Sequence, residues 1–468
     1  MSNNRRDFLK LSGLAGLGLV ASTVSVKAEQ AKNDILRQSK RTSSQIFNMS
    51  GYAAPKIDKV RVGFIGLGMR GPGAVNRMSK IEGVEIKALC DLRAEKVAQV
   101  KEKLKGTKHD PDEYSGSAYA WKKMVDRDDI DLIYIATPWD WHVPMAVYAM
   151  EAGKHVGVEV PAAKTIDECW ELVETSERTR KHCMMLENCC YDFFELLTLN
   201  MARDGFFGDI IHTEGAYIHD LLDLNFNKDA YQDMWRLKEN YRDGNLYATH
   251  GLGPVCQIMN INRGDQLDYL NSMSSADFHM AKKAEELAKE DEFFASYVNK
   301  RYGGNMNTTT IKTKKGKSMM IQHDVTSPRP YSRLHVISGT DGYAQKYPKP
   351  GIAKGHRWHK EDEMKALEDK YTPEIVKKVG DLAKQIGGHG GMDFMMEWRL
   401  VDCLRNGLPL DQDVYDAALW SAVSPLTEWS VANRSNSIDV PDFTNGAWKE
   451  NSPVDLSLQG GGNTKVIV

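Results

Sequence analysis

Short apolar runs alternate with amphipathic segments between residues 59 and 187, and this alternation is the clearest pattern in the chain. Each run has the length of a buried strand, and each amphipathic segment has the spacing of a helix. The pattern predicts strands over residues 59–65, 84–91, 130–136, 155–160 and 183–186, and helices after Gly71 and over residues 143–152 and 166–180. Such a repeat is typical of an α/β protein with a parallel, doubly wound Rossmann sheet.

The first predicted strand leads into the pattern Gly66-x-Gly68-x-x-Gly71, and the second ends at the acidic residue Asp91. Here Gly66 would allow the tight turn, Gly68 the approach of a pyrophosphate, and Gly71 the close packing of the next helix. The phosphates would lie at the N-terminus of that helix. Asp91 is placed to bind a ribose, which predicts NAD, although Arg93 keeps NADP open. A glycine-rich turn without a ligand is the competing interpretation.

Polar side chains follow three of the predicted strands, in Thr137-Pro-Trp-Asp-Trp-His142, in Glu159-Val-Pro161 and in Glu187-Asn188. The carboxyl ends of parallel strands lie at one edge of a sheet, where ligands bind in this class of fold. The three segments therefore predict one binding crevice. Helix capping and turn formation are the competing interpretation for each.

Beyond residue 187 the pattern is less regular. Residues 308–325 alternate like a β-hairpin, and residues 281–301 and 360–386 are charged with helical spacing, as solvated helices are. A glycine-rich segment around His389 opens another helical pattern, and His389 is a further candidate for the crevice. The tail from Leu458 is polar and rich in glycine, which predicts a mobile end.

The first 28 residues differ in composition from the rest of the chain. Arg5-Arg6 precedes an apolar, glycine-rich run that ends in Val26-Lys-Ala28, which is typical of a twin-arginine export signal and predicts a periplasmic protein. A poorly ordered N-terminal helix is the competing interpretation. The predicted organisation is a signal over 1–28, a linker over 29–58, an NAD-binding domain over 59–187 and a substrate-binding domain over 188–468.

Composition and charge limit the classes of ligand and partner that the protein can be expected to bind. The 468 residues carry a net charge of −3 with acidic and basic side chains intermixed, which argues against nucleic acid and favours a small neutral ligand. No segment after the signal approaches about 18 consecutive apolar residues, so no membrane span is predicted. The seven cysteines are scattered and no cluster has metal-ligand spacing, so neither a disulfide framework nor a metal is predicted. A homo-oligomer stays open.

The chain resembles the Gfo/Idh/MocA oxidoreductase superfamily. The motifs that carry the resemblance are the Gly66 fingerprint, Ala136-Thr-Pro138, Gly153-Lys-His-Val and Glu159-x-Pro161. The resemblance implies a second, α+β domain with an open, largely antiparallel sheet that covers the nicotinamide. Members usually draw on a lysine in Glu-Lys-Pro and on an aspartate and a histidine from the second domain. This chain has Val160 in place of that lysine.

A narrower family carries the same substitution. The chain is similar to glycoside hydrolase family 109, the NAD-dependent α-N-acetylgalactosaminidases, over nearly all of its length after the signal. The motifs are Trp139-Asp-Trp-His142, Glu159-Val-Pro161, Glu187-Asn-Cys189, Met234-Trp-Arg-Leu237, Asn245-Leu-Tyr-x-Thr-His250 and Ile261-Asn-Arg-Gly-Asp265.

This resemblance implies two sets of site residues. The residues that would line the NAD site, with the three glycines, are Met69, Arg70, Asp91, Trp139, Asp140, Trp141, His142, Glu159, Val160 and Asn188. The residues that would face the sugar are Tyr217, Arg236, Tyr247, His250 and Tyr331.

NAD-dependent glycosidases are an exception to the rule of two carboxylates. The implied cycle begins with hydride transfer from C3 of the sugar to NAD⁺ while a base takes the C3 hydroxyl proton, and the ketone that forms at C3 acidifies the C2 proton. A base removes that proton, the aglycone leaves C1, water adds across the double bond, and the hydride returns to C3. Cleavage of a terminal α-N-acetylgalactosamine in this way retains the configuration, and the cofactor ends as it began.

That cycle needs bases at two ring carbons, and Tyr247 and His250 are the catalytic candidates. They stand three residues apart, and if that segment is helical they share a face and could address one edge of the sugar together. Histidine, with a pKa near about 6.5, suits proton transfer in both directions, whereas tyrosine, near about 10, needs a cationic neighbour to lower it. Arg236 could hold a hydroxyl or the acetamido carbonyl. A core aromatic residue and a capping histidine are the competing interpretation.

Three functions stay open on the sequence. The first is the glycosidase. The second is an exported sugar oxidoreductase with tightly bound nicotinamide, which would be expected to need the lysine that is absent at Val160. The third is a sugar or nucleotide sensor without catalysis. The natural glycan, the preference for N-acetylgalactosamine over galactose and the oligomeric state are not set by these motifs.

Overall fold

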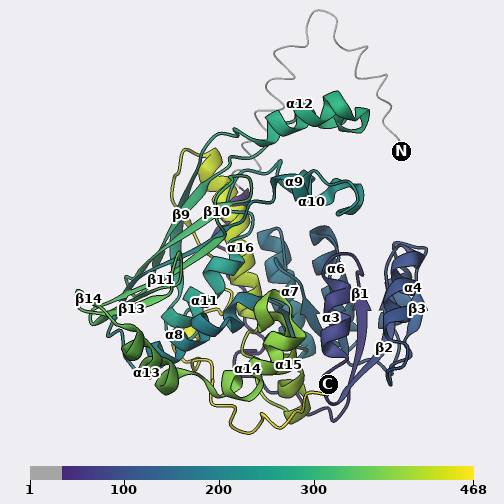
Figure 1. The fold of residues 1–468 in the computed structure, drawn as a ribbon, viewed down its shortest axis with the longest axis horizontal. Coiled ribbons are helices and arrows are strands. Elements are labelled where there is room, and N and C mark those ends of the chain that lie inside the picture. Colours follow the sequence, from purple (N-terminus) through teal and green to yellow (C-terminus); the bar gives the residue numbers. More distant parts are fainter. Residues whose placement is uncertain (1–33, 468) are drawn as a thin grey trace, which may run out of the picture.

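The structure is a computed structural model that describes residues 34–467, so the predicted export signal lies outside the described residues. Two β-sheets organise these residues. In Figure 1 the sheets lie on opposite sides of the molecule, with helices between them. Within residues 34–467, no helix has the length and hydrophobicity that a membrane crossing requires.

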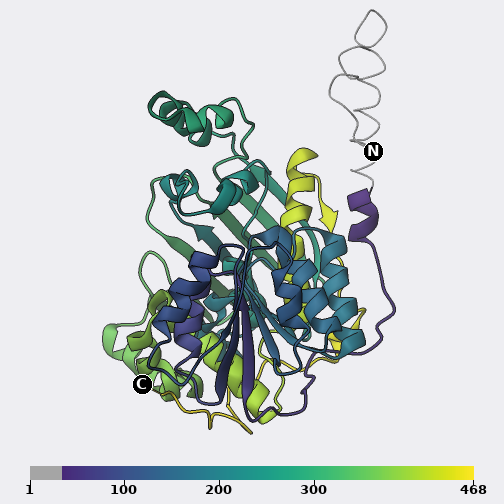
Figure 2. The ribbon, with the colours of Figure 1, turned by 90° about the vertical axis from the view of Figure 1, so that its right-hand side faces the viewer.

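The first sheet has six parallel strands in the order β3-β2-β1-β4-β5-β6, which is the doubly wound Rossmann order. Its strands are β1 (Val60–Ile65), β2 (Val84–Cys90), β3 (Asp112–Tyr114), β4 (Leu132–Ile135), β5 (His155–Val158) and β6 (Cys183–Met185). The helices that connect them are α3 (Gly71–Met78), α4 (Ala94–Lys103), α5 (Ala120–Val125), α6 (His142–Glu151) and α7 (Ile166–Thr179). Figure 2 shows helices on both sides of these strands. The predicted α/β fold is confirmed.

The second sheet is an open sheet of nine strands in the order β14-β13-β12-β11-β7-β10-β9-β8-β15. Only β7 and β10 pair in parallel, so the largely antiparallel sheet implied by the sequence is confirmed. Its strands are β7 (Ile210–Ile218), β8 (Leu267–Ser274), β9 (Asn307–Thr313), β10 (Ser318–Asp324), β11 (Ser332–Gly339), β12 (Gly342–Gln345), β13 (Gly351–Lys354), β14 (Arg357–Trp358) and β15 (Ile438–Asp439). The predicted hairpin is formed by β9 and β10.

Helices from the second half of the chain fill the space between the sheets. The helix α11 (Thr249–Met259) packs on β7, and α16 (Val414–Ala432) packs on α7, β6 and β8. The helix α15 (Met392–Asn406) is almost wholly buried and packs on α3 and β1 of the first sheet. Three further helices are α8 (Phe193–Arg203), α9 (Leu222–Asn225) and α10 (Trp235–Glu239). The predicted charged helices are α12 (Met280–Glu290), α13 (Glu361–Tyr371) and α14 (Glu374–Ile386).

The C-terminal tail is not a free end, which corrects the prediction from its composition. Its backbone donates from Gly462 to Asp402 over 2.8 Å, and Val466 forms a β-bridge with Ile81. The indole of Trp398 donates to the Thr464 carbonyl over 3.1 Å. Glycine supplies the turns of this segment, and the hydrogen bonds then hold it against α15.

Candidate active site

One cavity of about 560 Å³ lies at the carboxyl edge of the parallel sheet and extends to β7 and α11 of the second sheet. Its volume is in the usual range for small-molecule sites. The sequence-predicted residues that line it are Gly66, Gly68, Met69, Arg70, Asp91, Trp139, Asp140, Trp141, His142, Glu159, Val160, Asn188, Tyr217, Arg236, Tyr247, His250 and His389. The structure therefore brings the predicted nucleotide and sugar residues into one space.

Two predicted residues are not part of the lining. Gly71 begins α3, and a side chain there would have its Cβ 2.0 Å from the Gly66 carbonyl oxygen, so its role is close packing. Tyr331 lies one layer farther out, with its ring centroid 4.9 Å from that of His219 and 6.4 Å from that of Tyr217. Its hydroxyl accepts a hydrogen bond from Arg333.

The glycine turn fits a dinucleotide. Gly66 has φ +93°, and a Cβ there would lie 2.5 Å from the Ala136 carbonyl oxygen, so the tight turn requires glycine. Gly68 is different, because its nearest neighbour would be Arg93 at 3.8 Å and the space beyond it is open. An open face next to the start of α3 is the cradle that a pyrophosphate needs.

Asp91 follows β2 and is already oriented by the protein. One carboxylate oxygen accepts from the Leu67 backbone N–H over 2.7 Å, and the other accepts from the Arg93 backbone over 2.9 Å. The side chain of Arg93 also bonds to it over 3.3 Å. These bonds fix the carboxylate at the position where the ribose of NAD would be held.

A buried charge cluster lies between the nucleotide end and α15. Arg70 bonds to Glu159 over 2.9 Å and to Asp393 over 3.2 Å, and Asn188 donates to the other Asp393 oxygen. Burial alone would raise the pKa of Asp393, but the bond from His389 and the charge of Arg70 hold that pKa well below its usual range. Asp393 was not predicted from the sequence, although the glycine-rich segment that precedes it was singled out.

The ring nitrogens of His142 are both engaged by the backbone. Nδ1 lies 2.7 Å from the Pro161 carbonyl oxygen and Nε2 lies 2.9 Å from that of Thr137. His142 therefore shapes the wall of the cavity by joining the β4 and β5 ends. Asp140 is exposed and pairs with Lys164, which lies outside the cavity. Within residues 34–467, no lysine lines this cavity, so no other lysine takes the place of the one that Val160 replaces.

Arg236 packs beside two stacked aromatic rings. Its guanidinium carbon is 4.9 Å from the ring centroid of Trp139 and 4.7 Å from that of Tyr247. Cation–π contacts of this kind stabilise a partly buried guanidinium, and Arg236 lines the cavity. The arrangement suits a neutral carbonyl or hydroxyl oxygen of a ligand.

Three rings meet at the sugar end of the cavity. Tyr217 lies near the end of β7, and His250 lies in the first turn of α11. Tyr247 lies two residues before the start of α11, so Tyr247 and His250 do not share a helix face as the sequence suggested. The ring centroids are 4.8 Å apart for Tyr247 and His250, 5.1 Å for Tyr217 and His250, and 4.8 Å for the two tyrosines. The prediction that Tyr247 and His250 address one edge of the site agrees with this contact.

The tyrosines do not ionise as easily as a general base would. Burial raises the pKa of Tyr247 well above its usual value, although the charge of Arg236 opposes the shift. Burial raises the pKa of Tyr217 to about 12. The cationic neighbour expected for Tyr247 is present, but desolvation outweighs it. In the protein without ligand both tyrosines are therefore hydrogen-bond donors.

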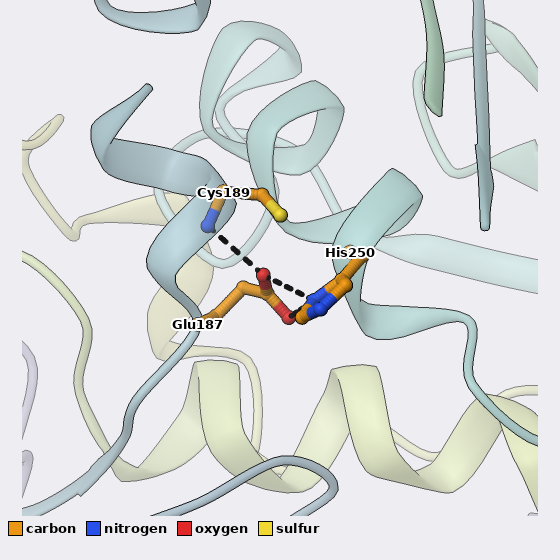
Figure 3. Close-up of side chains that lie close together, drawn as sticks. All are labelled: Glu187, Cys189 and His250. Atoms are coloured by element: carbon orange, nitrogen blue, oxygen red, sulfur yellow. Dashed lines mark hydrogen bonds and ion pairs between the residues drawn. The ribbon is translucent and has the colours of Figure 1, made fainter. Parts of the chain in front are cut away.

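Two polar residues of this cluster were not predicted. The carboxylate of Glu187 lies 2.7 Å from Nδ1 of His250 (Figure 3). His219 lines the cavity, and its Nδ1 lies 3.0 Å from the hydroxyl of Tyr217. Sequence reasoning marked Glu187 only as a strand end, because its partner is more than sixty residues away along the chain.

A short segment after β7, residues 221–235, lines one end of the cavity. Leu221, Leu224, Tyr231 and Trp235 line it there, from the region of α9 and α10. Figure 1 shows these helices near the top of the molecule, below α12. Apolar residues at this end limit the access of water to the ring cluster.

Comparison with known proteins assigns both halves of the chain. Residues 60–187 match the oxidoreductase family with an NAD-binding Rossmann fold, and residues 191–450 match the C-terminal domain of glycosyl hydrolase 109. Among solved structures, levoglucosan dehydrogenase in complex with NADH and levoglucosan has a TM-score of 0.60 at 18% identity, covering 82% of this chain and 100% of that one. Myo-inositol 2-dehydrogenase from Lactobacillus plantarum has a TM-score of 0.58 at 17% identity, with 82% and 100% covered.

Relatives of known sequence extend over nearly the whole chain. A glycosyl hydrolase family 109 protein of Bacteroides fragilis strain YCH46 is 49% identical, over 93% of this chain and 96% of its own. An alpha-N-acetylgalactosaminidase of Shewanella oneidensis is 45% identical, over 97% of this chain and 98% of its own. The chain is therefore an NAD-binding member of glycosyl hydrolase family 109.

Proposed function

We propose that the protein hydrolyses glycosides that end in α-linked N-acetylgalactosamine, with transient oxidation at C3 and retention of configuration. The observation that carries the proposal is the single cavity that joins the glycine turn to the Tyr217, Tyr247 and His250 rings. The name of the Shewanella oneidensis relative supports the sugar. Bound NAD would supply reversible oxidation at C3, so each turnover leaves the cofactor unchanged.

The residues of the chain supply binding and proton transfer. His250 is the general base, because a neutral imidazole accepts a proton near neutral pH while the two tyrosines stay protonated. Tyr247 donates a hydrogen bond to an oxygen of the sugar. Arg236 binds the acetamido carbonyl or a hydroxyl through its N–H donors, and its guanidinium packs against Trp139. These roles give proton transfer to histidine and hydrogen bonding to tyrosine and arginine, without a lysine.

A test uses an aryl α-N-acetylgalactosaminide in deuterated water without added cofactor. The proposal expects release of the aglycone, deuterium at C2 of the released sugar and no net NADH. Release without deuterium at C2 would contradict the mechanism and indicate direct displacement. Net NADH with an intact glycoside would contradict hydrolysis and indicate a sugar oxidoreductase.

We also propose that the protein is exported to the periplasm by the twin-arginine route. The support is Arg5-Arg6 with the apolar run that follows it. This route carries folded proteins, so NAD can be bound before export. A cycle that restores its cofactor needs no external NAD pool, whereas a dehydrogenase that consumed NAD⁺ would stop after one turnover.

A further inference from the structure

The carboxylate of Glu187 is directed at the imidazole of His250 (Figure 3). Nδ1 of His250 lies 2.7 Å and 2.9 Å from its two oxygens, and the Cys189 backbone N–H donates to one of them over 3.1 Å. Glu187 has no exposed surface, and the His250 side chain is 13% exposed. Water therefore screens the pair weakly.

The two residues are brought together from different halves of the chain. Glu187 follows β6 of the parallel sheet, whereas His250 lies on α11, which packs on the second sheet. Gly253 lies one turn beyond His250, and a Cβ there would be 2.9 Å from Cγ of Glu187. The missing side chain lets Glu187 lie flat against α11 and reach the ring.

The pairing determines which nitrogen of the His250 ring carries the hydrogen. Complete burial alone would raise the pKa of Glu187, but the charge of His250 and the bonds from His250 and Cys189 lower it. An ionised carboxylate can only accept, so Nδ1 keeps its hydrogen and Nε2 carries the lone pair. Within residues 34–467, Nε2 has no hydrogen-bond partner, and the ring lines the cavity.

We propose that Glu187 is a positioning residue that holds His250 in the Nδ1–H tautomer, so that Nε2 accepts a proton from the sugar. The proton moves from the sugar to Nε2 and later leaves from the same atom, and Glu187 stays ionised. The catalytic use of the pair depends on the proposed glycosidase function, but the tautomer is a property of the protein alone.

A metal ion is the alternative for this cluster, because ligand atoms of Glu187, Cys189 and His250 lie within 4.8 Å of one another. Two observations argue against it. Nδ1 bonds directly to the carboxylate, and burial raises the pKa of the Cys189 thiol well above its usual range, which leaves it a poor ligand. The other titratable groups near the ring are Tyr217, His219 and Tyr247.

The first experiment compares Glu187→Gln, Glu187→Asp and Cys189→Ala in the full-length protein with bound NAD. An amide can donate to Nδ1 and move the hydrogen to Nε2, so Glu187→Gln should lower kcat by about 10²- to 10⁴-fold. KM should stay within about threefold, because the sugar contacts are intact. Cys189→Ala keeps the carboxylate–imidazole pair and should retain wild-type kcat.

Rescue by the conservative variant separates positioning from a merely structural role. Glu187→Asp keeps a carboxylate and should recover part of kcat, whereas Glu187→Gln should not. Wild-type kcat in Glu187→Gln would overturn the proposal. Loss of activity in Cys189→Ala, restored by added Zn²⁺, would indicate the metal.

The second experiment needs no substrate. In ¹⁵N-histidine NMR spectra, assigned with His250→Ala, the wild type should show His250 as the Nδ1–H tautomer and Glu187→Gln should not. If the wild type fails to cleave the glycoside but shows this tautomer, the proposed function fails and the positioning role stands. If the wild type cleaves it with His250 as the Nε2–H tautomer, the positioning role fails alone. Where Glu187→Gln does not fold, the wild-type and Glu187→Asp spectra decide.

Discussion

At the residue scale, burial gives Tyr247 and His250 different roles, which the sequence alone did not distinguish. Tyr247 and His250 are in ring contact, yet desolvation disfavours the ionised tyrosine, whereas His250 has an anionic partner in Glu187. The two residues therefore differ in role. The histidine accepts protons and the tyrosine donates a hydrogen bond.

Removal of either group should impair turnover without unfolding the protein. Tyr247→Phe and His250→Ala should each lower kcat by about 10²-fold or more, because each removes one proton-transfer or hydrogen-bonding partner. Steady-state kinetics with an aryl α-N-acetylgalactosaminide, beside thermal melts, measures this. Tyr269→Phe, on the exposed face of β8, is the matched control and should leave kcat and the melting temperature unchanged. Wild-type rates in both site variants would place the proton transfers elsewhere.

The ion cluster at Asp393 should show a defined pH dependence. Its folded-state pKa is depressed by His389 and Arg70 against the effect of burial, so its stabilising contribution is present above an ordinary aspartate pKa of about 3.9 and is lost as pH falls below it. Asp393→Asn should lower the free energy of unfolding at pH 7 by about 3 kcal/mol.

Denaturant titrations at pH 7 and pH 3 check this expectation. The difference in the free energy of unfolding between the wild type and Asp393→Asn should be largest at pH 7 and should be smaller at pH 3. A difference that is equal at both values would show that the charge of Asp393 does not contribute. Bound NAD should also fall in Asp393→Asn, because Arg70 and Asn188 both depend on this carboxylate.

At the element scale, two glycines in the turn between β1 and α3 have different roles, one in binding the cofactor and one in both binding and stability. Gly68 faces open space, so Gly68→Ala should leave the melting temperature unchanged and yet lower bound NAD by at least about tenfold, the equivalent of about 1.4 kcal/mol. At Gly66, a Cβ would strike the Ala136 backbone and the positive φ would be strained, so Gly66→Ala should lower both the melting temperature and bound NAD.

The two glycine variants are tested by thermal melts and by the amount of NAD released on denaturation, measured by absorbance and an enzymatic assay. Full NAD content in Gly68→Ala would show that the dinucleotide does not approach this turn. An unchanged melting temperature in Gly66→Ala would show that the turn tolerates a side chain.

The sequence predicted most elements of the parallel sheet, because their apolar runs are local patterns. It did not predict β3, since Asp112–Tyr114 is a short, polar edge strand. It also did not show that α15 returns to cover β1, because the near-total burial of that helix removes the amphipathic pattern. Elements fixed by local pattern were thus predictable, and those fixed by distant packing were not.

The same division applies to the candidate site. The glycines and strand-end residues lie in local motifs, and the family resemblance supplied Tyr217, Arg236, Tyr247 and His250. Glu187 and Asp393 pair with His250 and Arg70, which are distant along the chain, so no spacing in the sequence marks these pairs. His219 lies only two residues from its partner Tyr217, and no motif in the sequence singled it out.

At the scale of the whole molecule, the site draws on both halves of the fold, because its cavity extends from the carboxyl edge of the parallel sheet to β7 and α11. The nucleotide end belongs to the parallel sheet and the ring cluster to β7 and α11, and the Glu187–His250 pair joins them. A protein that folds around its cofactor before export would carry NAD with it.

Export can be tested on the same chain. Replacing Arg5 and Arg6 by lysine should move the protein from the periplasmic to the cytoplasmic fraction, because the twin-arginine route depends on the arginine pair. The exported wild type should release NAD on denaturation. Equal export of the double variant would contradict this route, and exported protein without NAD that is nevertheless active would contradict loading before export.

The central claim is that the glycosidic bond breaks only after oxidation at C3. The most direct measurement compares an aryl α-N-acetylgalactosaminide with its 3-deoxy analogue, which has no hydroxyl to oxidise. The account predicts release of the aryl group from the first and none from the second, while the analogue still inhibits cleavage of the first. Cleavage of the 3-deoxy analogue at the rate of the parent would contradict it.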